Sequence, residues 1–148
     1  MSEILISALS VGVLSWLWAV LSGKLALITW VGFIGCTSYY ASGSNLKKSV
    51  ICNISGVFWA MVVILGAKYI DYPRVPAILT GIFSFAMCYQ AKCKKLSFIP
   101  GTFMGACSTF GSSGDYKLVI ISLLCGSLVG FFSDLAGKYI FLKYVKKY

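Results

Sequence analysis

The chain has 148 residues, of which 59% are hydrophobic and only 11% are charged, and its formal net charge is +9. Soluble domains carry about 25% charged residues, so this composition excludes a water-soluble globule of this size and favours a chain that folds in lipid. The positive charge comes almost wholly from lysines in short clusters, which is typical of loops that face an anionic membrane surface. These lysines form no continuous basic face, which makes nucleic acid a weaker interpretation.

Six stretches without charged residues predict six transmembrane helices, because each is near the ~20 residues that a helix needs to cross a hydrocarbon core. The windows are 4–23, 25–46, 49–67, 75–91, 96–114 and 118–133. The first reads as a retained helix, since Glu3 replaces the positive n-region of a signal peptide. The last extends to about 142 if Asp134 and Lys138 are tolerated, and at i, i+4 on one helical face these two can pair. No segments alternate as a membrane barrel requires, so the predicted fold class is an all-α membrane protein.

An internal duplication organises the chain. The stretch Trp30–Tyr40 reappears seventy residues later as Pro100–Phe110. Identical pairs at this offset include Phe33 and Phe103, Gly35 and Gly105, Ser38 and Ser108, Ser42 and Ser112, Lys47 and Lys117, Ile51 and Ile121, Gly56 and Gly126, and residues 68–70 with 138–140. The chain is therefore predicted to be one membrane domain of two repeats, 1–70 and 71–148, joined around residues 71–76.

Three crossings per repeat is an odd number, so the second repeat is expected to enter the membrane upside down relative to the first. Two inverted three-helix repeats are a recurrent plan for transporters, whose solute site tends to lie near the midplane. The count of basic residues predicts both termini in the cytoplasm. That side would carry Lys47, Lys48, Lys92, Lys94, Lys95, Lys143, Lys146 and Lys147, and the opposite side only Lys24, Lys68, Arg74 and Lys117.

The repeated stretch is the middle helix of each half and forms the candidate pore. Gly101 and Gly105 lie four residues apart and form a small face where another backbone can come close, and Gly32 and Gly35 serve similarly. Hydroxyls can line the gaps that small residues leave, and aromatic side chains such as Tyr40 and Phe110 can narrow them. The predicted pore-lining residues are Trp30, Gly32, Gly35, Thr37, Ser38, Tyr39, Thr102, Phe103, Gly105, Ser108 and Thr109. For any single residue, packing is the alternative, because such hydroxyls most often bond their own helix.

Other polar residues favour structural roles. Asn45 and Asp115 occupy equivalent positions after the middle helices and are expected to cap the helices that follow them. Asn53 and Gln90 are expected to form hydrogen bonds between helices. The six cysteines lie mostly in apolar runs, where they behave as small hydrophobes, and no metal site is predicted.

Several function classes are disfavoured. The chain contains no histidine and its few carboxylates stand apart, so no nucleophile–base pair can be assembled and an enzyme is not expected. The span centres carry no ionisable residue, which argues against a proton-driven antiporter. No phosphate-binding glycine loop is present, and no cofactor is predicted.

Five stretches together carry a family resemblance. They are Trp30–Tyr40, residues 55–62, Gln90–Lys92, Phe98–Phe110 and residues 114–119. These stretches resemble the YcdZ-like family of small bacterial inner-membrane proteins, which is grouped as a domain of unknown function. The resemblance covers nearly the whole chain, with Pro100–Phe103 as its most specific part. It implies a multi-pass protein of the bacterial inner membrane and supplies no activity, and Asp134 and the lysine-rich C-terminus look less typical of it.

The favoured function is a membrane channel or facilitator for a small neutral or weakly polar solute, with its pore between the two middle helices. The expected partners are the lipid bilayer, this small-molecule solute and further copies of the chain in a homo-oligomer, but no nucleic acid. A structural or regulatory membrane subunit that does not conduct is the main alternative. A small-anion channel, attracted by the basic loops, is the third.

Overall fold

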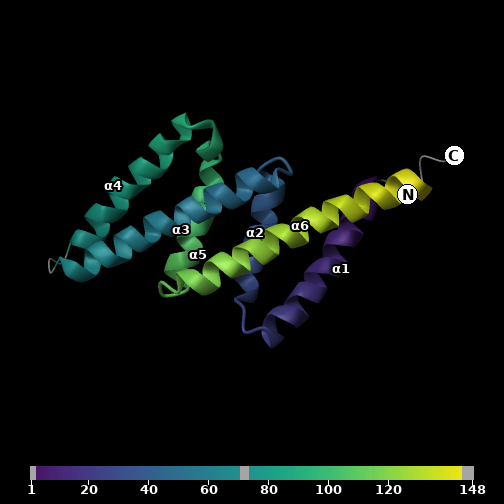
Figure 1. Cartoon of the computed structure of the whole chain (residues 1–148), viewed down its shortest axis with the longest axis horizontal. Coiled ribbons are helices and arrows are strands. Elements are labelled where there is room, and N and C mark those ends of the chain that lie inside the picture. Colours follow the sequence, from purple (N-terminus) through teal and green to yellow (C-terminus); the bar gives the residue numbers. More distant parts are fainter. Residues whose placement is uncertain (1–2, 71–73, 145–148) are drawn as a thin grey trace.

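The computed structural model describes residues 3–70 and 74–144, and these residues form helices joined by short turns (Figure 1). The described helices are α1 (Glu3–Lys24), α2 (Thr29–Ala41), α3 (Leu46–Tyr69), α4 (Val75–Tyr89), the single 3-10 turns η1 (Gln90–Lys92) and η2 (Lys94–Leu96), α5 (Ile99–Gly111) and α6 (Tyr116–Tyr144). The predicted all-α class is confirmed. Residues 71–73 of the predicted joint, and Lys146 and Lys147, lie outside the described residues.

The helices fall into two length classes. Helices α1, α3 and α6 are long and apolar enough to cross a membrane. Helices α2 and α5 have 13 residues each and α4 has 15, so at 1.5 Å per residue they span only about 20–23 Å of a ~30 Å hydrocarbon core. They are shorter than the charge-free windows because the ends of those windows form uncharged turns. The six crossings and their inverted order stay a prediction.

Four helices form the centre of the bundle, and two flank it. Helices α3 and α6 pack against each other and run in opposite directions along the long axis (Figure 1). Helix α2 packs along α6, whereas α5 packs along α3, so each middle helix lies against the long helix of the other half. Helices α1 and α4 lie outside this core, with α1 packed mainly on α6 and α4 mainly on α3.

The turns that follow the two middle helices have the same backbone geometry. Two consecutive residues are left-handed in both: Gly43 (φ 77°) and Ser44 (φ 58°) after α2, and Ser113 (φ 53°) and Gly114 (φ 83°) after α5. Each turn therefore holds one serine in a conformation that favours glycine. The positions lie seventy residues apart, so the duplication extends to the shape of the turn.

The predicted helix caps are confirmed. The side chain of Asn45 accepts a hydrogen bond from the Lys48 amide at 3.0 Å, and that of Asp115 accepts one from the Leu118 amide at 3.2 Å. Each bond satisfies an amide in the first turn of a long helix, where no intrahelical partner exists.

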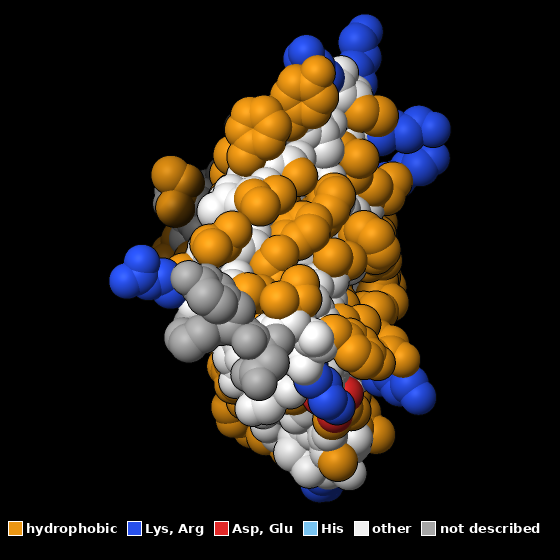
Figure 2. Space-filling view, turned by 90° about the vertical axis from the view of Figure 1, so that its left-hand side faces the viewer, with side chains coloured by type: hydrophobic (Ala, Val, Ile, Leu, Met, Phe, Trp, Pro, Cys, Tyr) orange, Lys and Arg blue, Asp and Glu red, His pale blue; other side chains and the backbone are white. Residues whose placement is uncertain are grey.

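The molecule is apolar outside and partly polar inside. Figure 2 shows a broad apolar surface with Lys and Arg side chains at its margins. Large side chains such as Trp16, Phe85 and Leu142 are exposed. The buried polar residues are Ser22, Ser38, Ser49, Asn53, Thr102, Ser108, Thr109, Ser122, Ser127 and Ser133. This distribution suits a chain whose outer surface meets lipid and whose helices are joined by hydrogen bonds.

Candidate functional site at the crossing of the middle helices

Two glycines of the middle helices bring helix backbones into direct contact. A Cβ placed on Gly35 would collide with the carbonyl oxygen of Leu123 in α6, and one on Gly105 would collide with the carbonyl oxygen of Asn53 in α3. Residues 35 and 105, and 53 and 123, are equivalent at the seventy-residue offset. The small faces thus serve the close helix approach that the sequence predicted.

The long helices contribute two further glycines to the same crossings. A Cβ on Gly56 would collide with the carbonyl oxygen of Thr102, and one on Gly126 with the carbonyl oxygen of Gly32. Each crossing is therefore closed by one glycine from the middle helix and one from the long helix. These four glycines therefore hold the helix backbones in direct contact at both crossings.

Most of the predicted pore-lining residues are brought together in the interior. Gly32, Gly35, Ser38 and Tyr39 on α2 are buried, as are Thr102, Gly105, Ser108 and Thr109 on α5. Phe103 is half-buried, while Trp30 and Thr37 are exposed. The hydroxyl of Thr37 donates to the Phe33 carbonyl of its own helix at 2.9 Å. For this residue, the structure favours a role in helix packing over the predicted pore-lining role.

A buried hydrogen-bonded chain joins α2 to α3 at this crossing. The Ser49 hydroxyl donates to the Ser38 hydroxyl at 2.8 Å, and Ser38 donates to the Asn53 side-chain oxygen at 2.8 Å. All three residues are at most 1% exposed. The Asn53 amide nitrogen, Nδ2, is also buried and has no hydrogen-bond partner. Because an unpaired buried donor is costly, this amide marks a place where a hydrogen-bond acceptor would be favourable.

The second half has no such hydrogen-bonded chain at the equivalent position. Leu123 stands where the first half has Asn53, and Ser108, the equivalent of Ser38, donates to the Met104 carbonyl at 2.7 Å. Thr109 likewise bonds its own helix, at the Gly105 carbonyl and 2.9 Å. The unpaired amide donor is therefore present in the first half only, although the glycine contacts of the two halves are equivalent.

A second polar cluster ties the end of α4 to α3 and α5. The Gln90 side-chain oxygen accepts from the Ser55 hydroxyl at 2.8 Å and from the Trp59 indole at 2.9 Å, and its amide donates to Thr102 at 2.9 Å. The predicted interhelical roles of Gln90 and Asn53 are confirmed by these contacts. Three helices meet at one amide side chain.

Replacing Gln90 with methionine is expected to lower the free energy of unfolding by about 2–3 kcal/mol, because three hydrogen bonds worth about 1 kcal/mol each are lost and their partners are buried (Thr102) or half-buried (Ser55 and Trp59). Thermal unfolding in mild detergent, followed by circular dichroism, measures this. Tyr89→Met, at the neighbouring exposed position, is the control and is expected to change the midpoint little. A Gln90→Met midpoint equal to wild type would contradict the assigned role.

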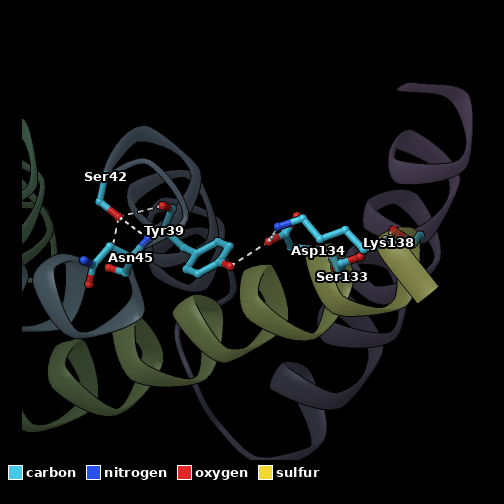
Figure 3. Close-up of polar contacts among 7 residues, drawn as sticks. Tyr39, Ser42, Asn45, Ser133, Asp134 and Lys138 are labelled. Atoms are coloured by element: carbon cyan, nitrogen blue, oxygen red, sulfur yellow. Dashed lines mark hydrogen bonds and ion pairs between the residues drawn. The ribbon is translucent and has the colours of Figure 1, made fainter. Parts of the chain in front are cut away.

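A third contact joins the middle helix α2 to an ion pair on α6 (Figure 3). The predicted pairing of Asp134 with Lys138 is confirmed at 2.7 Å, and the Tyr39 hydroxyl donates to the same carboxylate oxygen at 3.0 Å. Asp134 is inside the continuous helix Tyr116–Tyr144, with ten residues after it. The sequence identified the pair from its spacing but gave no signal for the Tyr39 contact, which crosses between repeats.

An apolar cavity of about 270 Å³ adjoins the Gln90 cluster, between α3, α4 and α5. Trp59 connects the two, since its ring lines the cavity while its indole nitrogen bonds Gln90. Phe103 and Phe110, both expected to narrow a passage, also line this cavity. An apolar space with a few polar groups at its margin is the usual form of a small-molecule site.

An apolar exterior around a centre of buried hydroxyls and amides defines a helical membrane protein. The chain belongs to the family described as "Protein of unknown function (DUF1097)", which matches residues 8–138.

Curated relatives agree with this assignment. The chain is 42% identical over 136 residues to "Inner membrane protein YcdZ" of Escherichia coli (strain K12), covering 88% of this chain and 83% of the relative. It is 40% identical to the protein of the same name from Salmonella typhimurium (strain LT2), covering 88% and 85%. It is 28% identical to "Uncharacterized protein YahC" of Escherichia coli (strain K12), covering 93% of each chain. No solved structure matches the chain.

Proposed function

We propose that the protein is a passive channel or facilitator for a small neutral or weakly polar solute, built from two inverted three-helix repeats with both termini in the cytoplasm. The opposite directions of α3 and α6 and the contacts that recur at the seventy-residue offset support the inverted plan. The names of the relatives support an inner-membrane location. Assembly into a homo-oligomer is part of this proposal, because six thin helices make a small unit.

The buried amide of Asn53 carries this proposal. It lies where α2, α3 and α5 meet: its side chain bonds Ser38 of α2, and its backbone carbonyl touches Gly105 of α5. A solute with a carbonyl or hydroxyl oxygen would accept a hydrogen bond from Nδ2 and remove the cost of leaving it unpaired. Ser38 and Ser49 hold the amide in place.

The chemistry of this centre favours neutral solutes. Asn53, Ser38 and Ser49 offer hydroxyls and an amide and no formal charge, whereas an ion needs compensating charges or many oxygen ligands to leave water. The apolar cavity between α3, α4 and α5, which Trp59 links to Gln90, would pass the apolar part of such a solute. Small amides and alcohols combine both features.

Asn53→Leu tests the proposal, because leucine already occupies the equivalent position, Leu123. Ser38 can then bond its own helix, as Ser108 does in the second half, so the fold is expected to keep its stability within about 1 kcal/mol. Flux of small amides and alcohols into liposomes containing the purified protein is expected to fall about tenfold, the effect of one lost hydrogen bond on a neutral solute.

Ile54→Leu is the matched control, since Ile54 is exposed and its equivalent is Leu124. It is expected to leave flux unchanged. No flux for any amide, alcohol, short acid or ion with the wild-type protein, beside a working control channel, would reject conduction. Equal flux through Asn53→Leu and wild type would reject the assigned site.

A non-conducting structural or regulatory subunit is the second candidate. The backbone contacts at Gly35, Gly56, Gly105 and Gly126 favour it, because they close the helix crossings tightly. In that case the liposomes would show no flux, and a partner protein would co-purify with the chain from its native membrane. An excess of anion conductance in bilayer recordings would instead identify an anion channel.

A further inference from the structure

A basic cavity lies at the start of α3. Its volume is about 270 Å³, and four of its six lining residues are lysines: Lys47 and Lys48 from α3, and Lys94 and Lys95 from η2. The other two are Asn45 and Ile51, so no carboxylate lines it. Two segments far apart in the sequence thus place four positive charges around one hollow. Like charges this close repel one another unless an anion lies between them.

The carboxylates of Asp115 and Asp134 lie away from this basic cavity. Asp115 caps α6 in the turn that follows α5, and Asp134 is paired with Lys138. The cavity's charge is therefore not balanced by its own lining. Its equivalent at the other end of the repeat is weaker, because residues 24, 25, 117 and 118 are Lys, Leu, Lys and Leu. Residues 47, 48, 94 and 95 of the basic cavity are all lysines, whereas only two of their four equivalents at the seventy-residue offset are lysines.

A second, apolar hollow lies further along the same face of α3, starting one helical turn after Ile51. Ile51 lines the basic cavity, and Ile54, Phe58 and Leu65 follow at spacings of three, four and seven residues, which keep them on one helical face. This second hollow has a volume of about 430 Å³. Its remaining lining is Val57, Met61 and Val62 of α3 with Tyr116 and Ile120 of α6.

We propose that this face is a binding site for one phospholipid with an anionic headgroup. The headgroup phosphate would lie among Lys47, Lys48, Lys94 and Lys95, and an acyl chain would follow Ile51, Ile54 and Phe58 between α3 and α6. A basic hollow with an apolar groove further along the same helical face matches both parts of such a molecule. The site is independent of whether the protein conducts.

The test compares lipid affinity of two double variants with the same charge change. Lys47→Gln/Lys94→Gln removes two charges from the cavity, and Lys24→Gln/Lys117→Gln removes their equivalents at the other end. All four lysines are exposed, so both proteins are expected to fold. Binding of phosphatidylglycerol and phosphatidylcholine to the detergent-purified proteins is measured by native mass spectrometry across a lipid titration.

The wild type is expected to retain phosphatidylglycerol in preference to phosphatidylcholine. Lys47→Gln/Lys94→Gln is expected to bind phosphatidylglycerol roughly thirtyfold more weakly, since each lysine near such a surface contributes about fivefold. The control pair is expected to stay within about twofold of wild type. Equal losses in both variants, or equal retention of both lipids by the wild type, would overturn the proposal.

A second arm separates a lipid from free phosphate. Phe58→Gln puts a polar side chain into the groove and leaves the lysines intact, so it is expected to weaken phosphatidylglycerol binding. Inorganic phosphate at millimolar concentration is expected to displace little lipid, because it lacks the acyl contact. Full displacement by phosphate, together with unchanged binding by Phe58→Gln, would assign the cavity to a free anion and overturn the lipid site.

Discussion

Gly56→Ala is expected to destabilise the protein by about 3 kcal/mol or more, at the upper end of the effects of overpacking. A Cβ at this position would collide with the Thr102 carbonyl oxygen and lie 2.8 Å from the Ala106 amide. Both atoms belong to the backbone of α5, so no side-chain rotation can make room. Helices α3 and α5 must separate, and the contact of Gly105 with Asn53 would loosen with them.

Gly81→Ala makes the same chemical change but is expected to stabilise the protein. Gly81 lies within α4, and apart from its chain neighbours and the nearby backbone of its own helix, no atom of the described residues comes within 4 Å of a Cβ placed there. Alanine is about 1 kcal/mol better than glycine in a helix interior, so this variant is expected to melt slightly higher than wild type. Thermal unfolding in one detergent, for both variants, checks the pair. Midpoints that shift in the same direction would contradict the assigned packing of Gly56.

This packing changes which variants can test conduction. Leucine at Gly35 or Gly105 would push apart the backbones at residues 123 and 53. A loss of flux in such a variant would report a broken helix crossing, whether or not a pore exists. Asn53→Leu avoids this difficulty, because its side chain has a tolerated counterpart in the second half.

Local and periodic features were predictable from the sequence. The seventy-residue repeat located both middle helices, and the cap positions Asn45 and Asp115 followed from residue type and place. The Asp134–Lys138 pair followed from helical spacing alone. The caps and the ion pair depend on neighbours within one or two turns, and the repeat is visible when the two halves of the sequence are aligned.

Helix lengths and side-chain contacts between helices were not predictable in the same way. The charge-free windows ran through Gly43 and Ser44, which carry no charge yet end α2 in a left-handed turn. The Ser38–Asn53 bond and the Tyr39–Asp134 bond join helices whose mutual rotation depends on the glycine crossings. Spacing within one helix carries no information about that rotation.

Lys138→Met is expected to destabilise the protein by about 2–3 kcal/mol, because the mostly buried Asp134 carboxylate loses its cation, although the Lys138 side chain itself is 57% exposed. The Asp134 side chain is only 18% exposed, and after the change it keeps the Tyr39 hydroxyl as donor but loses its cationic partner. In the first half, Ile64 and Lys68 hold the equivalent positions. There the helix ends at Tyr69, so Lys68 can reach the membrane surface without a carboxylate.

Adding Asp134→Ile to Lys138→Met is expected to restore most of the lost stability, because an apolar pair of similar size removes both charges together. Thermal unfolding of the two single variants and the double variant forms a double-mutant cycle. The double variant should be more stable than either single variant, although Tyr39 then loses its acceptor and about 1 kcal/mol remains missing. Strictly additive losses would mean that the two charges act separately, and the bond from Tyr39 would then be the principal link between α2 and this part of α6.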